Sequence, residues 1–247
     1  MHYRLIVEYD GTEFHGWQLQ PDRRTVQGTL ETALARLLGQ PIRVAAAGRT
    51  DAGVHAAGQV VCFHSARQLP LATLRRALNA LTPDDLTVCA ADTVPDDFDA
   101  RRAARSRRYV YRIWNRPEPS PFWRRYAWHV PRALDRAAMQ SAADALVGEH
   151  DFSSFRATGC AAAHPVRRVL RSALERRGAL LAYEIEATAF LRHMVRNIVG
   201  TLVEVGQGRR SADFAALLAA RDRGLAAATA PAHGLCLVEI RYDRMCG

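Results

Sequence analysis

The segment 47–55 brings two glycines, an arginine, a carboxylate and an imidazole together within one short stretch. It lies between two predicted strands, so we expect it to form a tight loop. Glycines allow backbone conformations that other residues resist, and they let a ligand come close to the main chain. Arg49 could keep Asp51 ionised and pointed at a reacting carbon. The loop therefore predicts a chemically active carboxylate, with His55 beside it.

A structural use of Asp51 is also consistent with this spacing. Aspartate commonly caps a turn, because its side chain accepts a hydrogen bond from the backbone two residues on. On spacing alone we favour that structural role. The chemical interpretation of the loop therefore depends on residues elsewhere in the chain.

The apolar segment Phe190–Val205 predicts a helix with two distinct faces. One face is a buried stripe of large side chains. The other carries four polar or small residues, His193, Arg196, Asn197 and Gly200. Arg196 should be at least partly buried there, and a buried guanidinium is costly unless a carboxylate meets it. Asp51 is one candidate for that carboxylate; alternatively, Arg196 extends to solvent or pairs with the structural acid Glu204.

Arginines and aromatic residues are interleaved in two neighbouring stretches. The first runs from Arg101 to Trp114 and the second from Phe122 to Trp128. This mixture suits RNA, because arginines hold phosphates while exposed rings stack on unpaired bases. Rings on a strand can equally fill a core. We expect Tyr111 to do so, although one face of that strand can still be functional.

The apolar pattern of the first half predicts the order strand, helix, strand, strand, helix, strand. The first helix should lie between the cap residue Thr25 and the stop residue Gly39. The predicted strands are 3–9, 42–46, 59–64 and 86–94, and the predicted helices are 26–38 and 71–81.

The second half repeats this order. Its predicted strands are 108–115, 169–175, 180–187 and 235–242, and its helices are 134–147, 190–205 and a shorter one after the cap candidate Ser211. We therefore predict an α+β protein of two ferredoxin-like (βαββαβ) halves with antiparallel sheets. The domains should be 1–104, carrying the Asp51 loop, and 105–247, carrying Tyr109 and Arg196. Basic residues would line a central cleft between them.

The net charge of the chain points to a polyanionic partner. The 247 residues include 34 basic and 25 acidic side chains, for a net charge of +9, and every basic side chain is arginine. The absence of lysine excludes a Walker loop and Schiff-base chemistry. Genome composition can explain arginine in place of lysine. It does not explain the positive sign, which favours a partner such as RNA.

Metal and membrane functions have little support in the sequence. The five cysteines are far apart and form no Cys-x-x-Cys pair, which argues against a disulfide framework or a zinc site. The acidic run 95–99 is typical of a solvated loop, and we assign it no metal. We find no signal peptide and no stretch of membrane-spanning length. We therefore expect a cytoplasmic protein with reduced thiols.

With these residues assembled, the sequence resembles the TruA family of transfer-RNA pseudouridine synthases. The resemblance extends from near the N-terminus to the last strand. Its most specific parts are Arg-Thr-Asp at 49–51, within the segment 48–55, and Met-Val-Arg-Asn at 194–197. The other matching segments are 8–11, 16–18, 97–101, 107–111, 151–156, 190–200 and 226–230.

The resemblance implies an enzyme that isomerises uridine to pseudouridine in tRNA, without a cofactor or a metal. In the family the target uridines lie in the anticodon stem-loop, at tRNA positions 38–40. Asp51 matches the essential aspartate, Tyr109 the tyrosine that stacks on the target uracil, and Arg196 the arginine that pairs with the aspartate. Arg49 and His55 are further candidates for contact with the substrate. Members of the family have two ferredoxin-like halves and act as homodimers.

Two other functions remain open from the residues alone. A non-catalytic RNA-binding module would use the same basic and aromatic residues and would not need Asp51. A base-exchange enzyme or glycosidase would also use a carboxylate, but it would release the free base.

Overall fold

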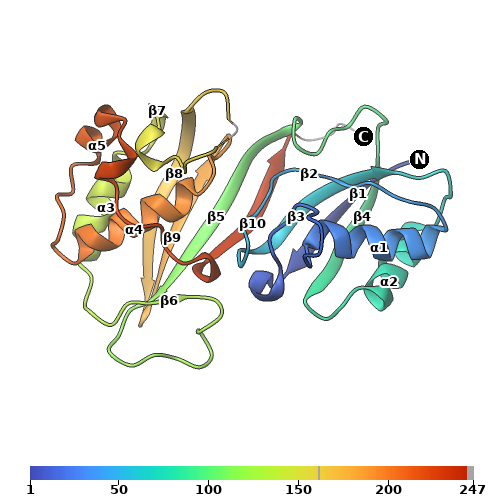
Figure 1. Ribbon diagram of the computed structural model, residues 1–247, viewed down its shortest axis with the longest axis horizontal. Helices are drawn as coiled ribbons and strands as arrows, with labels where there is room; N and C mark the ends of the chain where they lie inside the picture. Colours follow the sequence, from blue (N-terminus) through green and yellow to red (C-terminus); the bar gives the residue numbers. More distant parts are fainter. Residues whose placement is uncertain (161, 244–247) are drawn as a thin grey trace. The chain divides into compact units, whose positions relative to one another are not determined.

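The computed structural model describes residues 1–160 and 162–243, which form a mixed α/β protein with a mostly antiparallel sheet (Figure 1). Two compact units can be distinguished. The first comprises Met1–Arg105 together with the chain from Cys236 to Asp243, and the second comprises Ser106–Leu235. The sequence pattern placed the last strand in the second half. Instead, the last strand clusters with the first unit, because Cys236 and Leu237 pair in parallel with His55 and Ala56.

The sheet of the first unit is built around its first strand, β1 (His2–Tyr9), which pairs antiparallel with β3 (His55–His64) and β4 (Leu86–Val94). The other edge of β3 takes β2 (Ala45–Ala46) at one end and β10 (Leu235–Tyr242) at the other. The predicted strand 42–46 is thus mostly irregular. Its Val44 N–H donates to the carboxylate of Glu31, 3.0 Å away, and does not join the ladder.

The two helices of the first unit match their predictions. Helix α1 (Val26–Leu38) begins after Thr25, whose hydroxyl accepts from the Gly28 N–H, and it ends at Gly39 in the left-handed conformation. Helix α2 (Leu71–Leu81) packs against α1 and β4. Their apolar stripes are fully buried in the core at Leu30, Leu34, Leu74 and Leu78.

The second unit has an antiparallel sheet in the order β5-β9-β8-β7. Its strands are β5 (Ala104–Trp114), β9 (Leu180–Ala187), β8 (Val166–Arg177) and β7 (Gly148–Asp151). The short strand β6 (Trp128–His129) runs parallel to β5. Strands β6 and β7 were not predicted, because two and four residues are too few for an alternating pattern to show.

The first two helices of the second unit, α3 (Arg136–Asp144) and α4 (Met194–Gly206), are shorter than predicted. The third is α5 (Phe214–Ala220). Helix α4 begins four residues later than its apolar pattern suggests, since His193 has a φ of 61° and interrupts the helical backbone. Helix α5 is capped by Asp213, whereas Ser211 accepts a hydrogen bond from the Asp213 N–H. No helix in the described part of the chain is long and apolar enough to cross a membrane.

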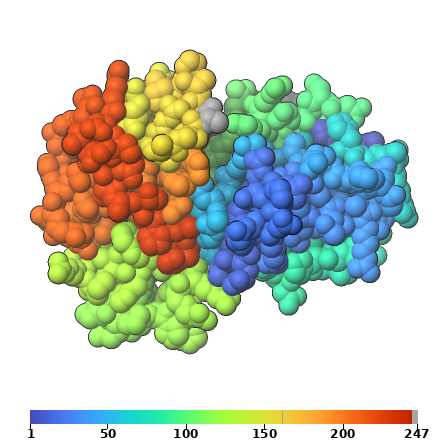
Figure 2. Space-filling view, viewed as in Figure 1, coloured from blue at the N-terminus to red at the C-terminus, as the bar shows by residue number. Residues whose placement is uncertain are grey.

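A long loop of the second unit leaves β5 after Trp114 and returns to pair with it at β6. In Figure 1 it extends beyond the ends of β5 and β9, and in Figure 2 the same segment lies on the surface. It contains the second of the two stretches in which arginines and aromatic residues alternate.

Candidate active site

Backbone bonds fix the loop that carries Asp51 on both sides of the carboxylate. Before it, the Thr50 carbonyl accepts a hydrogen bond of 3.0 Å from the Trp17 N–H. After it, the Gly53 N–H donates to the Phe14 carbonyl at 3.3 Å, and the Val54 N–H donates to the Asp51 carbonyl at 3.1 Å. Asp51 itself is partly exposed. The loop therefore presents a carboxylate on a backbone that is held in place.

Tyr9, at the end of β1, holds the same loop from inside the first unit. Its hydroxyl shares a 2.8 Å hydrogen bond with the Thr50 hydroxyl. Burial raises the pKa of Tyr9 well above its ordinary value, so the hydroxyl stays protonated near neutral pH. Trp17 and Phe14 lie near its ring, with centroids 6.4 and 6.3 Å away.

Two glycines let neighbouring segments approach the Asp51 loop closely. A β-carbon on Gly11 would lie 2.1 Å from the Val54 carbonyl oxygen. Gly16 has a φ of +85°, and a β-carbon there would lie 2.8 Å from the Thr50 carbonyl oxygen. The residues themselves gave no hint of these contacts, because the partners are distant in the sequence. Only the family resemblance had singled out the segments 8–11 and 16–18.

We expect Gly11→Ala to destabilise the protein by about 1–3 kcal/mol and to lower activity further by displacing the loop, because there is no room for the added methyl group. Denaturant unfolding and an assay of the predicted activity measure the two effects. Gly48→Ala is the matched control for stability in the same loop, since a β-carbon there meets nothing within 4 Å. Equal losses of stability in the two variants would contradict this account of the loop.

His55 lies at the start of β3 and is only 5% exposed. The Gly11 N–H donates to its Nδ1 at 3.0 Å, and the same atom lies 3.1 Å from the Asp10 carboxylate. This geometry supports a part for His55 in holding the loop against the turn at 10–11. Arg49 is exposed at the surface. Contact of either residue with the substrate stays a prediction.

Tyr109 lies on β5 in the second unit and is 9% exposed. Its ring packs edge-on against Phe190, with centroids 5.1 Å apart and planes at 86°. Two residues on, Tyr111 is fully buried and donates to the Pro231 carbonyl at 2.8 Å, which confirms the expectation that it fills the core.

Arg196 lies in the first turn of α4 and is partly buried. Its Nε donates to the Ala230 carbonyl at 2.8 Å, and the Ala230 N–H donates back to the Arg196 carbonyl at 3.1 Å. Glu204, the alternative partner considered for Arg196, bonds to Arg210 at 3.0 Å. The segment around Ala230 therefore fixes the stem of the Arg196 side chain.

Other residues on the polar face of α4 contact the segment 226–230 and fix its position. Asn197 is completely buried; its amide donates to the Phe155 carbonyl at 2.8 Å, and its oxygen accepts from the Thr229 hydroxyl at 2.6 Å. A β-carbon on Gly200 would lie 2.0 Å from the Ala228 carbonyl oxygen. The segment 226–230 thus packs tightly on the helix that carries Arg196.

We expect Asn197→Ala to lower the free energy of unfolding by at least about 2 kcal/mol. The reason is that it leaves the Phe155 carbonyl and the Thr229 hydroxyl without their buried partner, and each such loss costs about 1–3 kcal/mol. Chemical denaturation measures the change. A loss below about 0.5 kcal/mol for the alanine variant would contradict the role of this network.

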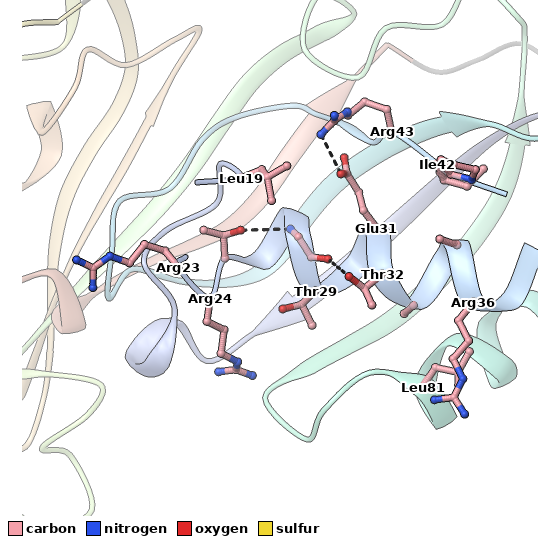
Figure 3. Close-up of a pocket in the computed structure, with 15 residues that line it drawn as sticks. Leu19, Arg23, Arg24, Thr29, Glu31, Thr32, Arg36, Ile42, Arg43 and Leu81 are labelled. Atoms are coloured by element: carbon pink, nitrogen blue, oxygen red, sulfur yellow. Dashed lines mark hydrogen bonds and ion pairs between the residues drawn. The ribbon is translucent and has the colours of Figure 1, made fainter. Parts of the chain in front are cut away.

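A groove of about 800 Å³ runs along α1 in the first unit (Figure 3). None of the predicted site residues lines it. Two of its arginines are neutralised by acids, since Arg43 bonds to Glu31 at 3.0 Å and Arg24 bonds to Asp85 at 2.6 Å. The groove is therefore less cationic than its arginine content suggests, and we do not assign the reaction to it.

Comparison with known proteins identifies the class of enzyme. The family model described as tRNA pseudouridine synthase matches residues 5–101 and 142–243. The tRNA pseudouridine synthase A of Myxococcus xanthus is 50% identical over 97% of this chain and 91% of the relative. The protein of the same name from Methylobacterium nodulans is 49% identical over 97% and 95%. The one from Geotalea uraniireducens is 45% identical over 97% and 98%.

The protein is thus an RNA-modifying isomerase that converts uridine in tRNA into pseudouridine. It belongs to the TruA family of tRNA pseudouridine synthases, as its motifs had indicated. The prediction of an enzyme is confirmed, and the two other functions left open by the residues, a non-catalytic RNA-binding module and a glycosidase, are set aside.

Proposed function

We propose that Asp51 is the catalytic carboxylate and that it acts on uridines in the anticodon stem-loop of tRNA, at the family positions 38–40. The main support for this proposal is that hydrogen bonds hold the Asp51 loop in place. Hydrogen bonds from Trp17, Gly53 and Tyr9 hold the residues around a partly exposed carboxylate. A reacting group has to be positioned in this way before the substrate arrives.

Tyr109 and Arg196 complete the proposed site. Arg196 pairs with the Asp51 carboxylate and orients it, and the ring of Tyr109 stacks on the target uracil. The geometry within the second unit supports these roles, because the Ala230 carbonyl orients the guanidinium of Arg196 and Phe190 orients the ring of Tyr109. Arg49 and His55 line the same site, Arg49 as a contact with RNA phosphate.

We further propose that the two units are ferredoxin-like halves and that a basic cleft receives the RNA. In the first unit, the order β1-α1-β2-β3-α2-β4 and the pairing of β1 with both β3 and β4 support this description. The net charge of +9 supports a phosphate-binding cleft. By resemblance to the family, the protein works as a homodimer. The spacing of its cysteines favours reduced thiols and hence the cytoplasm.

The reaction is a rearrangement within one nucleotide. The bond from the sugar C1′ to N1 of uracil breaks, a bond from C1′ to C5 forms, C5 loses a proton and N1 gains one. The composition is unchanged, so no external reactant is consumed. The target base has to leave the stacked arm at a cost of a few kcal/mol, which arginine–phosphate contacts and stacking on Tyr109 offset. Asp51 attacks the sugar or the ring, or stabilises a sugar cation while the freed base turns.

Incubation with unmodified tRNA, followed by mapping of pseudouridine at each position, tests the proposed substrate site. We expect product in the anticodon stem-loop and no free uracil. Product confined to another arm would overturn the proposed site in tRNA while leaving the isomerase activity intact. Static light scattering tests the dimer separately, and a monomer mass at all concentrations would refute it.

A further inference from the structure

The loop from Asn115 to Ala127 in the second unit is ordered by its own contacts. The rings of Trp114 and Trp123 are stacked, with centroids 6.2 Å apart and planes at 23°. The backbone N–H groups of Tyr126 and Ala127 both donate to the Trp123 carbonyl at 2.9 Å. The Trp123 N–H in turn donates to the Ser120 hydroxyl at 3.3 Å. Trp123 is thus the anchor that fixes the tip of the loop.

Further bonds tie the base of the loop to the strands. The Asn115 amide donates to the carbonyls of Val130 and Arg132, at 2.9 and 2.7 Å. The Trp114 indole donates to the Glu118 carbonyl at 3.1 Å, and the Arg116 guanidinium lies 5.0 Å from the Trp114 ring. These contacts order the loop and keep its tip in a defined position.

This ordered tip presents an aromatic ring to solvent. Phe122 is 87% exposed, the largest value for any large apolar side chain in the described part of the chain. A phenylalanine ring stabilises a protein when it is buried, and Phe122 makes no such contribution because it stays in water. Exposed rings of RNA-binding proteins stack on unpaired bases, so an anchored loop that leaves such a ring in water is suited to that contact.

The surroundings of Phe122 are cationic. The loop contains three arginines and one acid, and that acid, Glu118, lies 3.5 Å from Arg116. Arg124 and Arg125 are both exposed beside the ring, and no acidic residue occurs between Pro119 and Ala127. The tip therefore combines an exposed aromatic ring with two exposed arginines.

We propose that this tip, residues Phe122–Arg125, is a second RNA contact, separate from the Asp51 loop, in which Phe122 stacks on an unpaired base of tRNA and Arg124 holds an adjacent phosphate. Proteins bind single-stranded RNA with this pairing of ring and arginine. The charge favours RNA over a second copy of the chain, because two identical tips would bring arginines against arginines. The proposal rests on tRNA being the substrate and not on the role of Asp51.

The test measures tRNA affinity by filter binding at several salt concentrations. Phe122→Ser should weaken binding of unmodified tRNA roughly thirty-fold, the middle of the range for base–aromatic stacking, with little change in salt dependence. Phe122→Trp should retain binding. Arg124→Ser should reduce the slope of log affinity against log salt by about one unit. Leu170→Ser, which removes another exposed apolar side chain of the same unit, is the matched control for Phe122→Ser, and Arg209→Ser is the control for Arg124→Ser. Both controls should bind tRNA as the wild type does.

A perfectly paired RNA duplex serves as the second ligand. Phe122→Ser should bind it as the wild type does, because a duplex offers no unstacked base. The proposal is overturned if Phe122→Ser binds tRNA with unchanged affinity. It is also overturned if the variant's main effect is to halve the mass in light scattering, which would assign the tip to contact between copies. Asp51→Asn should leave tRNA binding intact, so failure of this proposal and failure of the catalytic assignment give different results.

Discussion

An Asp51→Asn enzyme is expected to fold normally, to bind tRNA at least as tightly as the wild type and to form no detectable pseudouridine. The substitution keeps the size of the side chain, and the backbone bonds that hold the loop come from Trp17, Gly53 and Val54. It removes the negative oxygen that the proposed chemistry needs. Loss of a group that forms bonds in the reaction typically lowers the rate by roughly 10⁴-fold or more. Single-turnover rates with saturating enzyme measure this loss without interference from binding.

Asp96→Asn is the matched control for this prediction, because Asp96 is an exposed acid of the same unit outside the site. It should modify tRNA at the wild-type rate. Thermal unfolding of both variants checks that the fold is intact. If Asp51→Asn still converted uridine at close to the wild-type rate, the carboxylate would be a turn residue, as its spacing alone had favoured.

The Arg196→Met enzyme should lose about 10²- to 10³-fold in single-turnover rate. In the proposed complex the RNA covers both side chains, and breaking an ion pair that is buried in this way costs about 3–5 kcal/mol, where 1.4 kcal/mol corresponds to a factor of ten. Arg196→Lys should recover little of this loss, since a lysine ammonium cannot reproduce both the bond from Nε to the Ala230 carbonyl and a forked contact with a carboxylate. The rate measurement is the same as for Asp51.

A double-substitution cycle sharpens the Arg196 prediction. If Arg196 acts through Asp51, then adding Arg196→Met to Asp51→Asn should cause almost no further loss, because the carboxylate it serves is already gone. Arg209→Met, on an exposed arginine just beyond α4, should leave the rate unchanged. Full additivity of the two losses would show that Arg196 contributes independently of Asp51.

Elements whose boundaries are set by local chemistry could be predicted from the sequence. Helix α1 is an example, since Thr25 caps it and Gly39 ends it within the same segment. The prediction failed where distant residues decide the backbone. The strand at 42–46 shrank because Val44 bonds to Glu31 on a helix, and β10 joined the first unit because its partner is β3. Neither contact leaves a trace in apolar periodicity.

The candidate site shows the same division. The residue types of the Asp51 loop and of the polar face of α4 could be read directly, and the chemical interpretation followed from the family resemblance. The contacts that hold the loop and the helix in place could not be predicted from the sequence. Tyr9 and Gly11 hold the loop from positions about forty residues away in the sequence, and the closeness of Gly200 to Ala228 depends on how a loop folds back on α4. Such contacts exist only after the chain has folded.

The most direct test of the central claim is a crystal structure of the protein bound to tRNA, in which the separation of the Asp51 carboxylate and the Arg196 guanidinium is measured. We predict that an oxygen of Asp51 lies within about 4 Å of a guanidinium nitrogen, the usual limit for an ion pair, and that both face an everted uridine. Two side chains far apart, each surrounded by water with no nucleotide between them, would contradict the account.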